Sequence, residues 1–187
     1  MAKLKQVLPF KGTTLVGHAV DTAVTAGFDP ILVVVGAESD AVQSAVAAKP
    51  VEIVRNSAWA AGMGSSIAAA ITQLQKIGAE SAAVAVLLSD QPLVTSEHLR
   101  EMRRLLNRSG ADAVAADYGG SLGVPAVFKR ALFPRLASLS PEAGAKAVLR
   151  DPTLNVVAMA LPEAAVDIDT PDDFERLRLS GSDAHQR

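Results

Sequence analysis

The chain has 187 residues, 49% of them hydrophobic and 20% charged, which predicts one globular domain with a substantial core. A formal net charge of −2 excludes the basic surface typical of nucleic-acid binding. The absence of cysteine excludes disulfides and thiolate metal sites. Since no apolar stretch reaches transmembrane length, we expect a cytoplasmic protein with neither membrane nor nucleic acid among its partners.

Helical and strand patterns alternate along the chain. Helices are expected over residues 14–26, 39–48, 65–77, 95–108 and 140–150, and a last helix opens at Thr170. Strands are expected over residues 31–36, 51–55, 82–90, 113–116 and 156–161. The repeated crossovers predict a three-layer, Rossmann-like α/β fold, in which a mostly parallel sheet carries helices on both faces. We expect residues 1–179 to form the single domain and residues 180–187 a polar tail.

Residues 82–92, AAVAVLLSDQP, combine a small apolar run with an acidic, turn-forming end. Such a run is typical of a strand buried on both faces of a sheet. Asp90 would lie just past the carboxyl end of this strand, where open α/β sheets bind ligands. The alternative is that residues 89–92 are only a turn before the next helix.

Residues 56–66, NSAWAAGMGSS, predict a glycine-rich loop that enters a helix. Its exposed N–H groups and hydroxyls could hold an anion or a nucleobase edge at the positive helix end. Alternatively, Ser65 or Ser66 only caps the helix. Trp59 could line a pocket or cover the edge of the core.

Two further segments could carry chemistry. In residues 166–174, VDIDTPDDF, Asp167 and Asp169 point to opposite faces if the segment is extended, so only one would face a site. If that carboxylate meets Asp90, the pair suits magnesium. In residues 118–128, YGGSLGVPAVF, three glycines before a proline mark either a loop that approaches a ligand or a wide turn. The three histidines lie far apart in the sequence and form no zinc motif.

Six motifs together resemble the MobA-like nucleotidyltransferases, and among them the molybdenum cofactor cytidylyltransferases. In chain order they are KQVLPF from Lys5, Asn56 with Trp59, GMGSS over 62–66, SDQP over 89–92, AGAK over 143–146 and DIDTPDD over 167–173. The resemblance extends from residue 1 to about residue 177. It implies a fold like that of the nucleotide-diphospho-sugar transferases.

The resemblance also implies an activity and roles for residues. The activity is magnesium-dependent transfer of CMP from CTP to the terminal phosphate of molybdopterin, with release of pyrophosphate. Asp90 would be the main metal ligand, Asp169 or Asp167 the second, and Lys5 the motif lysine that neutralises phosphate charge. The nucleotide pocket would include Asn56, Gly62, Met63, Ser65 and Ser66, and the pterin side would include Gly123 and Pro125. Such chemistry needs positioning and charge neutralisation rather than a covalent nucleophile.

The sequence departs from the family at its start. Members begin with a buried strand and a phosphate loop of the type LAAGxSxRMGxxK. Here residues 1–5 align with the end of that loop, with Ala2 at the expected glycine and no counterpart of the arginine. Val124 stands where relatives often carry histidine. Loss of a central strand should leave two unsatisfied strand edges or a hole in the core.

Two other functions therefore remain open. One is a non-catalytic module that binds the cofactor and delivers it to a molybdoenzyme. The other is a relative that uses GTP or another small phosphorylated acceptor.

Overall fold

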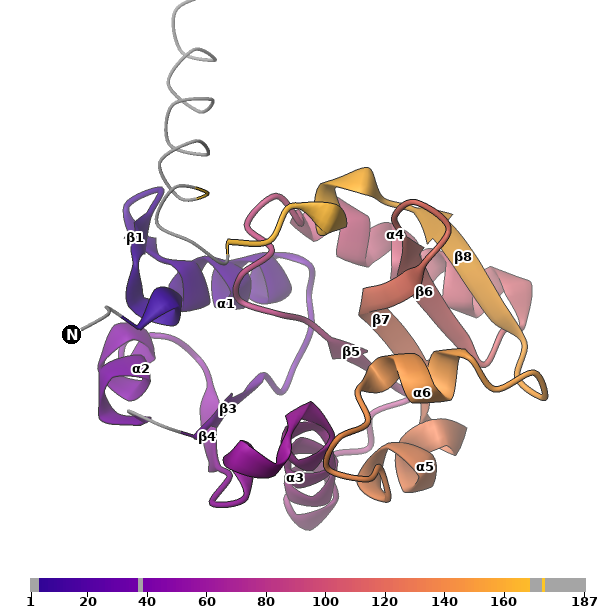
Figure 1. The fold of residues 1–187 in the computed structure, drawn as a ribbon, viewed down its shortest axis with the longest axis horizontal. Coiled ribbons are helices and arrows are strands. Elements are labelled where there is room, and N and C mark those ends of the chain that lie inside the picture. Colours follow the sequence, from indigo (N-terminus) through magenta and orange to yellow (C-terminus); the bar gives the residue numbers. More distant parts are fainter. Residues whose placement is uncertain (1–3, 37–38, 169–172, 174–187) are drawn as a thin grey trace, which may run out of the picture.

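Layers of helix on both faces of a sheet form the fold of the computed structural model, which describes residues 4–36, 39–168 and 173 (Figure 1). The helices are α1 (Leu15–Thr25), α2 (Ser39–Val46), α3 (Met63–Lys76), α4 (Ser96–Ser109), α5 (Phe133–Ala137) and α6 (Ala145–Leu149). The strands are β1 (Pro9–Phe10), β2 (Thr13–Thr14), β3 (Leu32–Val35), β4 (Glu52–Arg55), β5 (Ala83–Val86), β6 (Ala113–Asp117), β7 (Leu122–Lys129) and β8 (Val156–Ala160). Short 3₁₀ turns are η1 (Lys5–Val7), η2 (Trp59–Ala61), η3 (Arg130–Leu132) and η4 (Pro162–Ala165). The predicted α/β class is confirmed.

The sheet is divided rather than continuous. β3 and β4 form a parallel pair, and β5–β7–β6–β8 form a second sheet in which β6 and β8 are parallel. β7 runs antiparallel to both of its neighbours. A β1–β2 hairpin precedes α1. The glycines and Pro125 led the sequence analysis to treat β7 as a loop or turn, yet its side chains are almost all buried.

Helix ends follow local hydrogen bonding. Thr14 caps α1 by accepting a bond from the Gly17 N–H, and Thr95 caps α4 by accepting one from the His98 N–H. The expected helix over residues 140–150 is wrong in its first half, because α6 begins only at Ala145. Residues before it form a turn whose Pro141 carbonyl accepts a hydrogen bond from the Gly64 N–H at 2.9 Å. The helix expected at Thr170 lies outside the described residues.

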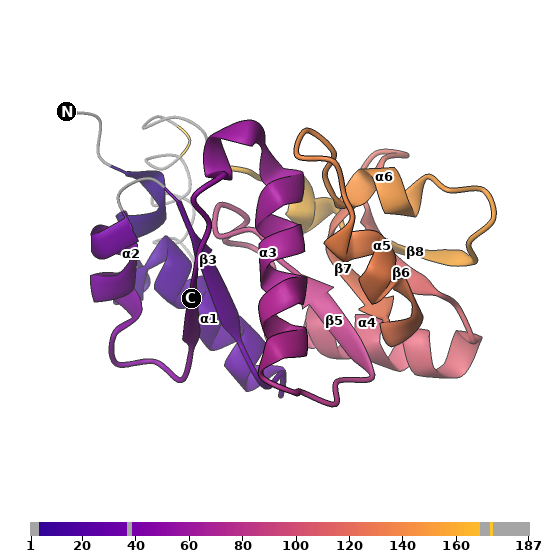
Figure 2. The same cartoon turned by 90° about the horizontal axis from the view of Figure 1, so that it is seen from below.

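Two apolar layers pack on opposite faces of the larger sheet. On one face α3, α5 and α6 cover Ala113, Ala115 and Phe128. On the other face α4 covers Val114, Ala116 and Val127. This alternation along β6 is what a strand buried on both sides requires. Figure 2 shows α3 lying across the side of the sheet between β3 and β5.

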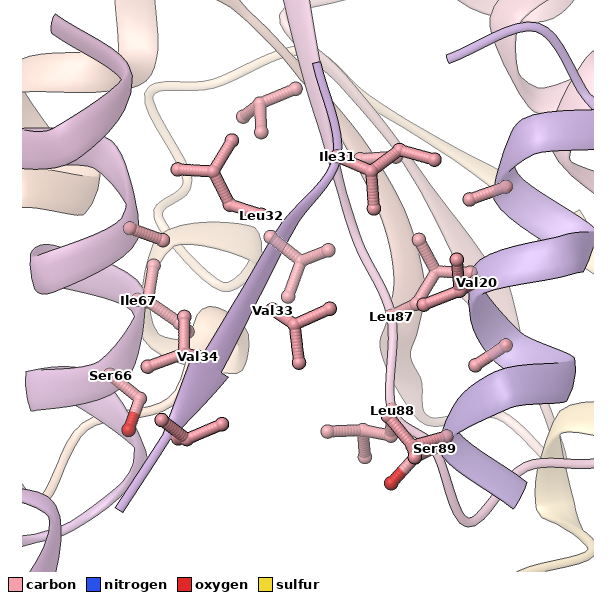
Figure 3. Close-up of a pocket in the computed structure, with 18 of the residues that line it drawn as sticks. Val20, Ile31, Leu32, Val33, Val34, Ser66, Ile67, Leu87, Leu88 and Ser89 are labelled. Atoms are coloured by element: carbon pink, nitrogen blue, oxygen red, sulfur yellow. The ribbon is translucent and has the colours of Figure 1, made fainter. Parts of the chain in front are cut away.

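A cavity of about 710 Å³ separates the two sheets. β3 and β5 form its edges, α1 and α3 cover its faces, and nearly all of its lining is aliphatic (Figure 3). The expected hole in the core is therefore confirmed. In Figure 3, Ile31 to Val34 and Leu87 to Ser89 descend side by side toward one mouth, so β3 and β5 run in the same direction.

Candidate active site at the carboxyl ends of β3 and β5

An ion pair between Lys5 and Asp90 lies beside one end of this cavity, because their chain neighbours Leu4, Gln6 and Ser89 line it. Lys5 Nζ lies 2.6 Å from Asp90 Oδ2, and the Asp90 side chain is only 17% exposed. Asp90 comes four residues after the end of β5, in the segment between β5 and α4. The strand therefore ends earlier than the apolar run 82–88, but Asp90 still lies beyond its carboxyl end as expected.

Two segments distant in the sequence hold the loop that carries Asp90. The Asp90 carbonyl accepts a hydrogen bond from the Ile168 N–H at 3.0 Å. The buried Gln91 amide donates to the carbonyls of Val124 at 3.1 Å and Ala164 at 2.7 Å. These bonds hold η4, the residues that follow it and the first part of β7 beside the Asp90 loop. Asp167, next to Ile168, therefore belongs to the same region of the molecule, and Asp169 lies outside the described residues.

The carboxylate of Asp90 has one oxygen available for a ligand. Asp90 Oδ1 is buried and has no hydrogen-bond partner among the described residues. A buried oxygen without a partner is costly and suits a metal ion. No group of three or more acidic or histidine residues within the described segments could hold a metal by itself. Mg²⁺ commonly uses only one or two carboxylates, so Asp90 fits such an ion.

The Asn56 side chain forms hydrogen bonds with the two serines at the start of α3, on the other side of the cavity mouth. Its side-chain amide donates to Ser65 Oγ at 2.8 Å and Ser66 Oγ at 3.0 Å, while Oδ1 accepts from the Ala58 N–H. Ser65 donates its proton to a backbone carbonyl, that of Ala58 or Gly62. Within the described residues the Ser66 hydroxyl donates to no acceptor, and Ser66 lines the cavity mouth, where Figure 3 shows its oxygen. Ser66 is therefore the hydroxyl free to meet a ligand.

The glycines of this loop allow close backbone packing. A Cβ on Gly64 would overlap the carbonyl oxygens of Ser140 and Ala143, and one on Gly62 would overlap that of Pro141. Gly62 caps α3 with φ +129°, so neither Ser65 nor Ser66 is the N-cap, and that alternative is wrong. The expectation of exposed N–H groups is also wrong for Gly64 and Ser65, whose N–H groups bond to Pro141 and Gly62.

Trp59 both lines the cavity and remains half-exposed. A Cβ on Gly36, at the end of β3, would overlap the Trp59 ring. Sequence reasoning missed Gly36 as part of this wall. The sequence did contain a signal for this contact, because a glycine directly follows the β-branched run 31–35.

A third group of residues in the candidate site consists of Tyr118, Gly123 and Lys146. Lys146 Nζ lies 5.7 Å from the centre of the Tyr118 ring, and Gly123 leaves room for the Tyr118 hydroxyl. Burial, and after it the Asp167 carboxylate, raises the pKa of the Tyr118 phenol. Pro125 follows in β7 next to Val124, whose carbonyl binds Gln91. Sequence reasoning missed the pairing of Tyr118 with Lys146, although both lie in segments it singled out.

The chain is similar in sequence and structure to known proteins. The profile described as MobA-like NTP transferase domain matches residues 1–157. The chain belongs to the MobA-like NTP transferase family. The predicted family is thus confirmed, and with it the assignment as a nucleotidyltransferase. No helix within the described residues has the length and apolar character to cross a membrane.

Several relatives share this family fold over most of their length. Nicotine blue oxidoreductase of Paenarthrobacter nicotinovorans is 30% identical, covering 92% of this chain and 87% of the relative. Purine catabolism protein PucB of Bacillus subtilis (strain 168) is 26% identical, covering 97% and 91%. The crystal structure of Rv0371c from Mycobacterium tuberculosis H37Rv is 28% identical with a TM-score of 0.76, covering 95% and 89%. A second structure of Rv0371c, a complex with manganese, has a TM-score of 0.71 and covers 94% and 91%.

Proposed function

We propose that this family member transfers CMP from CTP to the terminal phosphate of molybdopterin and releases pyrophosphate, with Mg²⁺ as its metal. The observation that supports it is the Lys5–Asp90 pair at the same mouth as the Asn56–Ser66 network. These residues suit a triphosphate and its metal ion. Lys5 supplies an ammonium group, Asp90 a carboxylate oxygen without a partner in the described chain, and Ser66 a hydroxyl. The choice of CTP and molybdopterin comes from the motif resemblance.

The reaction needs no covalent intermediate. An oxygen of the acceptor phosphate forms a bond to the α-phosphorus as the bond from that phosphorus to the pyrophosphate oxygen breaks. The acceptor is already an anion, so no side chain must remove a proton. Mg²⁺ held by Asp90, with Asp167 or Asp169 as second carboxylate, would supply charge neutralisation at the phosphates. Lys5 would neutralise further phosphate charge, and Ser66 would donate a hydrogen bond.

The test is pyrophosphate release with CTP, GTP and ATP, each with molybdopterin and Mg²⁺. Asp90→Asn should lower kcat/KM about 100-fold or more, because it removes a charge that acts at the reacting phosphates. Asp40→Asn, on the exposed face of α2, is the matched control and should leave the rate unchanged. Equal release by the wild type and Asp90→Asn would refute the role of Asp90. Nucleotide binding without any pyrophosphate release would favour the delivery module.

A serine pair makes the test more specific. Ser66→Ala should raise KM for the nucleotide about tenfold, since it removes a hydroxyl directed at the mouth. Ser65→Ala should raise KM less than Ser66→Ala does, because the Ser65 hydroxyl accepts from Asn56 and donates to backbone carbonyls. An equal KM effect of both substitutions would contradict this assignment.

A further inference from the structure

The imidazole of His18 joins α1 to the loop that carries Asp90. Its Nε2 lies 3.1 Å from the carbonyl oxygen of Pro92, which is 74 positions away in the sequence. Among the described residues, His18 is the only hydrogen-bond donor to this carbonyl. Because a carbonyl can only accept, the bond assigns the ring proton to Nε2. The Asp90 loop therefore has a side-chain anchor on α1.

This anchor leads to a different part of the fold from the bonds that Gln91 makes. The Gln91 amide bonds to carbonyls of β7, in the larger sheet, and of η4, which follows β8. In contrast, α1 packs with β3 and α2 in one apolar cluster. His18 thus ties the Asp90 loop to the side of the molecule that contains the β3–β4 pair, and Asn56 directly follows β4.

Packing fixes the orientation of the His18 ring. The Phe10 side chain, which is only 8% exposed, lies edge-on to the imidazole. The two ring centroids are 4.9 Å apart, and the ring planes meet at 76°. The first turn of α1, where His18 lies, is itself fixed by the Thr14 cap. The Nε2–H group is therefore held in the direction of the Pro92 carbonyl.

The charged groups around the ring leave it largely neutral at pH 7. Burial, and after it the charge of Lys11, lowers the pKa of His18. The bond to Pro92 and the Asp21 carboxylate act in the opposite direction, and Asp21 is itself paired with Lys49 at 2.7 Å. In the imidazolium form both ring nitrogens donate, so the bond to Pro92 persists on protonation. The anchor therefore does not depend on the protonation state of His18.

His18 does not belong to the cavity beside Asp90. It lines a second cavity of about 370 Å³ together with Lys11, Asp21 and residues 92–96. An effect of His18 on the site therefore passes through Pro92. The backbone between Pro92 and Asp90 is suited to transmit it, because proline fixes its own φ and restricts the residue before it.

We propose that His18 is a positioning residue for Asp90, whose carboxylate it holds across the cavity mouth from the Asn56–Ser66 network through the bond to Pro92. The inference rests on the proposed function, in which Asp90 binds the metal ion at the triphosphate. Groups that orient a metal ligand without touching the metal contribute about 10- to 100-fold to metal affinity. Because Gln91 also holds the loop, the loss of His18 should fall at the lower end of this range.

Four variants separate positioning from general destabilisation. His18→Leu keeps the bulk of the side chain and removes the donor, and His18→Asn keeps an amide that is too short to reach Pro92. His18→Gln restores an N–H donor at nearly the reach of Nε2. Thr14→Ala is the control, because it removes the N-cap of the same helix and leaves the bond to Pro92 in place.

Mn²⁺ binding and amide hydrogen exchange are the two measurements. The Kd for Mn²⁺, followed by the electron paramagnetic resonance of the free ion, should rise about tenfold in His18→Leu and His18→Asn. The Ile168 N–H bonds to the Asp90 carbonyl and the Val94 N–H to that of Gln91, so both amides report on the loop. Their exchange should become at least about fivefold faster in the same two variants. His18→Gln and Thr14→Ala should stay within about twofold of wild type in both measurements.

The outcomes distinguish this inference from the proposed function. If Asp90→Asn weakens Mn²⁺ binding and neither His18→Leu nor His18→Asn does, the positioning role is overturned. Equal losses in His18→Gln and His18→Leu would overturn it as well, because the donor would then be irrelevant. If Asp90→Asn binds Mn²⁺ as tightly as wild type, the metal role of Asp90 fails instead. Exchange at Ile168 and Val94 would then still decide whether His18 holds the loop.

Discussion

Substitution of Gln91 tests how the Asp90 loop is held. Gln91 is 5% exposed, and its amide group donates to the carbonyls of Val124 and Ala164. Gln91→Leu keeps the size of the side chain but removes both donors and leaves two carbonyls unbonded. Each lost bond costs about 1 kcal/mol, and an unsatisfied buried acceptor adds a similar amount. The removal of the unpartnered Oε1 offsets part of this, so we expect a loss of about 3 kcal/mol in the free energy of unfolding.

The assay is thermal unfolding followed by circular dichroism. For a domain of this size the loss corresponds to a fall in Tm of about 6–12 °C. Gln91→Glu should be worse at pH 7, because it places a carboxylate against two carbonyl oxygens. Burial raises the pKa of such a carboxyl, so the stability of that variant should recover as the pH falls and an O–H donor returns. Gln75→Leu, on the exposed side of α3, is the control. A Tm for Gln91→Leu within 2 °C of wild type would refute the reasoning, as would a pH-independent Tm for Gln91→Glu.

Two further predictions concern the other sides of the site. Gly64→Ala should lower the free energy of unfolding by about 1–3 kcal/mol in urea titrations, because its Cβ meets backbone carbonyls that cannot rotate away. Gly144→Ala, whose Cβ would lie 3.9 Å from Met63 Sδ, should change it by less than about 1 kcal/mol, and equal losses would contradict the clash. Tyr118 is the only tyrosine, and its raised pKa means that phenolate absorbance should appear above pH 10.0, with Asp167→Asn lowering that pH. Because the folded pKa is the higher one, stability from the neutral phenol is complete below about pH 10 and is lost as the pH rises further. An Asp167→Asn titration that matches wild type would show that the Asp167 charge does not act on Tyr118.

Much of the fold could be read from local signals. The apolar spacing and the glycine after α1 placed that helix within a residue, and the β-branched run placed β3. Such signals fail where tertiary contacts decide. Residues 140–144 look helical by composition, but the Pro141 carbonyl accepts a hydrogen bond from the Gly64 N–H of α3 instead of continuing a helix. β7 contains a glycine and a proline that ordinarily exclude a central strand, and burial on both faces overrides that preference.

The candidate site was predictable in position more than in detail. Asp90 at the end of an apolar strand, and Asn56 with the paired serines, could be found because polar residues follow buried strands. The partners could not be found by the same reasoning. The bond from Gln91 to Ala164 joins residues 73 positions apart, and the contact of Gly36 with Trp59 depends on how η2 folds back. Neither follows from local spacing. The cavity between β3 and β5, by contrast, was expected from the comparison of the first residues with the family motif.

The divided sheet has a mechanical consequence for the site. β6 packs without gaps, and four successive side chains from Ala113 to Ala116 are fully buried. Asp90 and Tyr118 follow strands of the β5–β7–β6–β8 sheet, whereas Asn56 follows β4 in the β3–β4 pair. No strand pairing joins β3 to β5 in the described chain. Within the described residues, the alignment of the two halves of the site therefore depends on the packing of α1 and α3 rather than on a continuous hydrogen-bonded ladder.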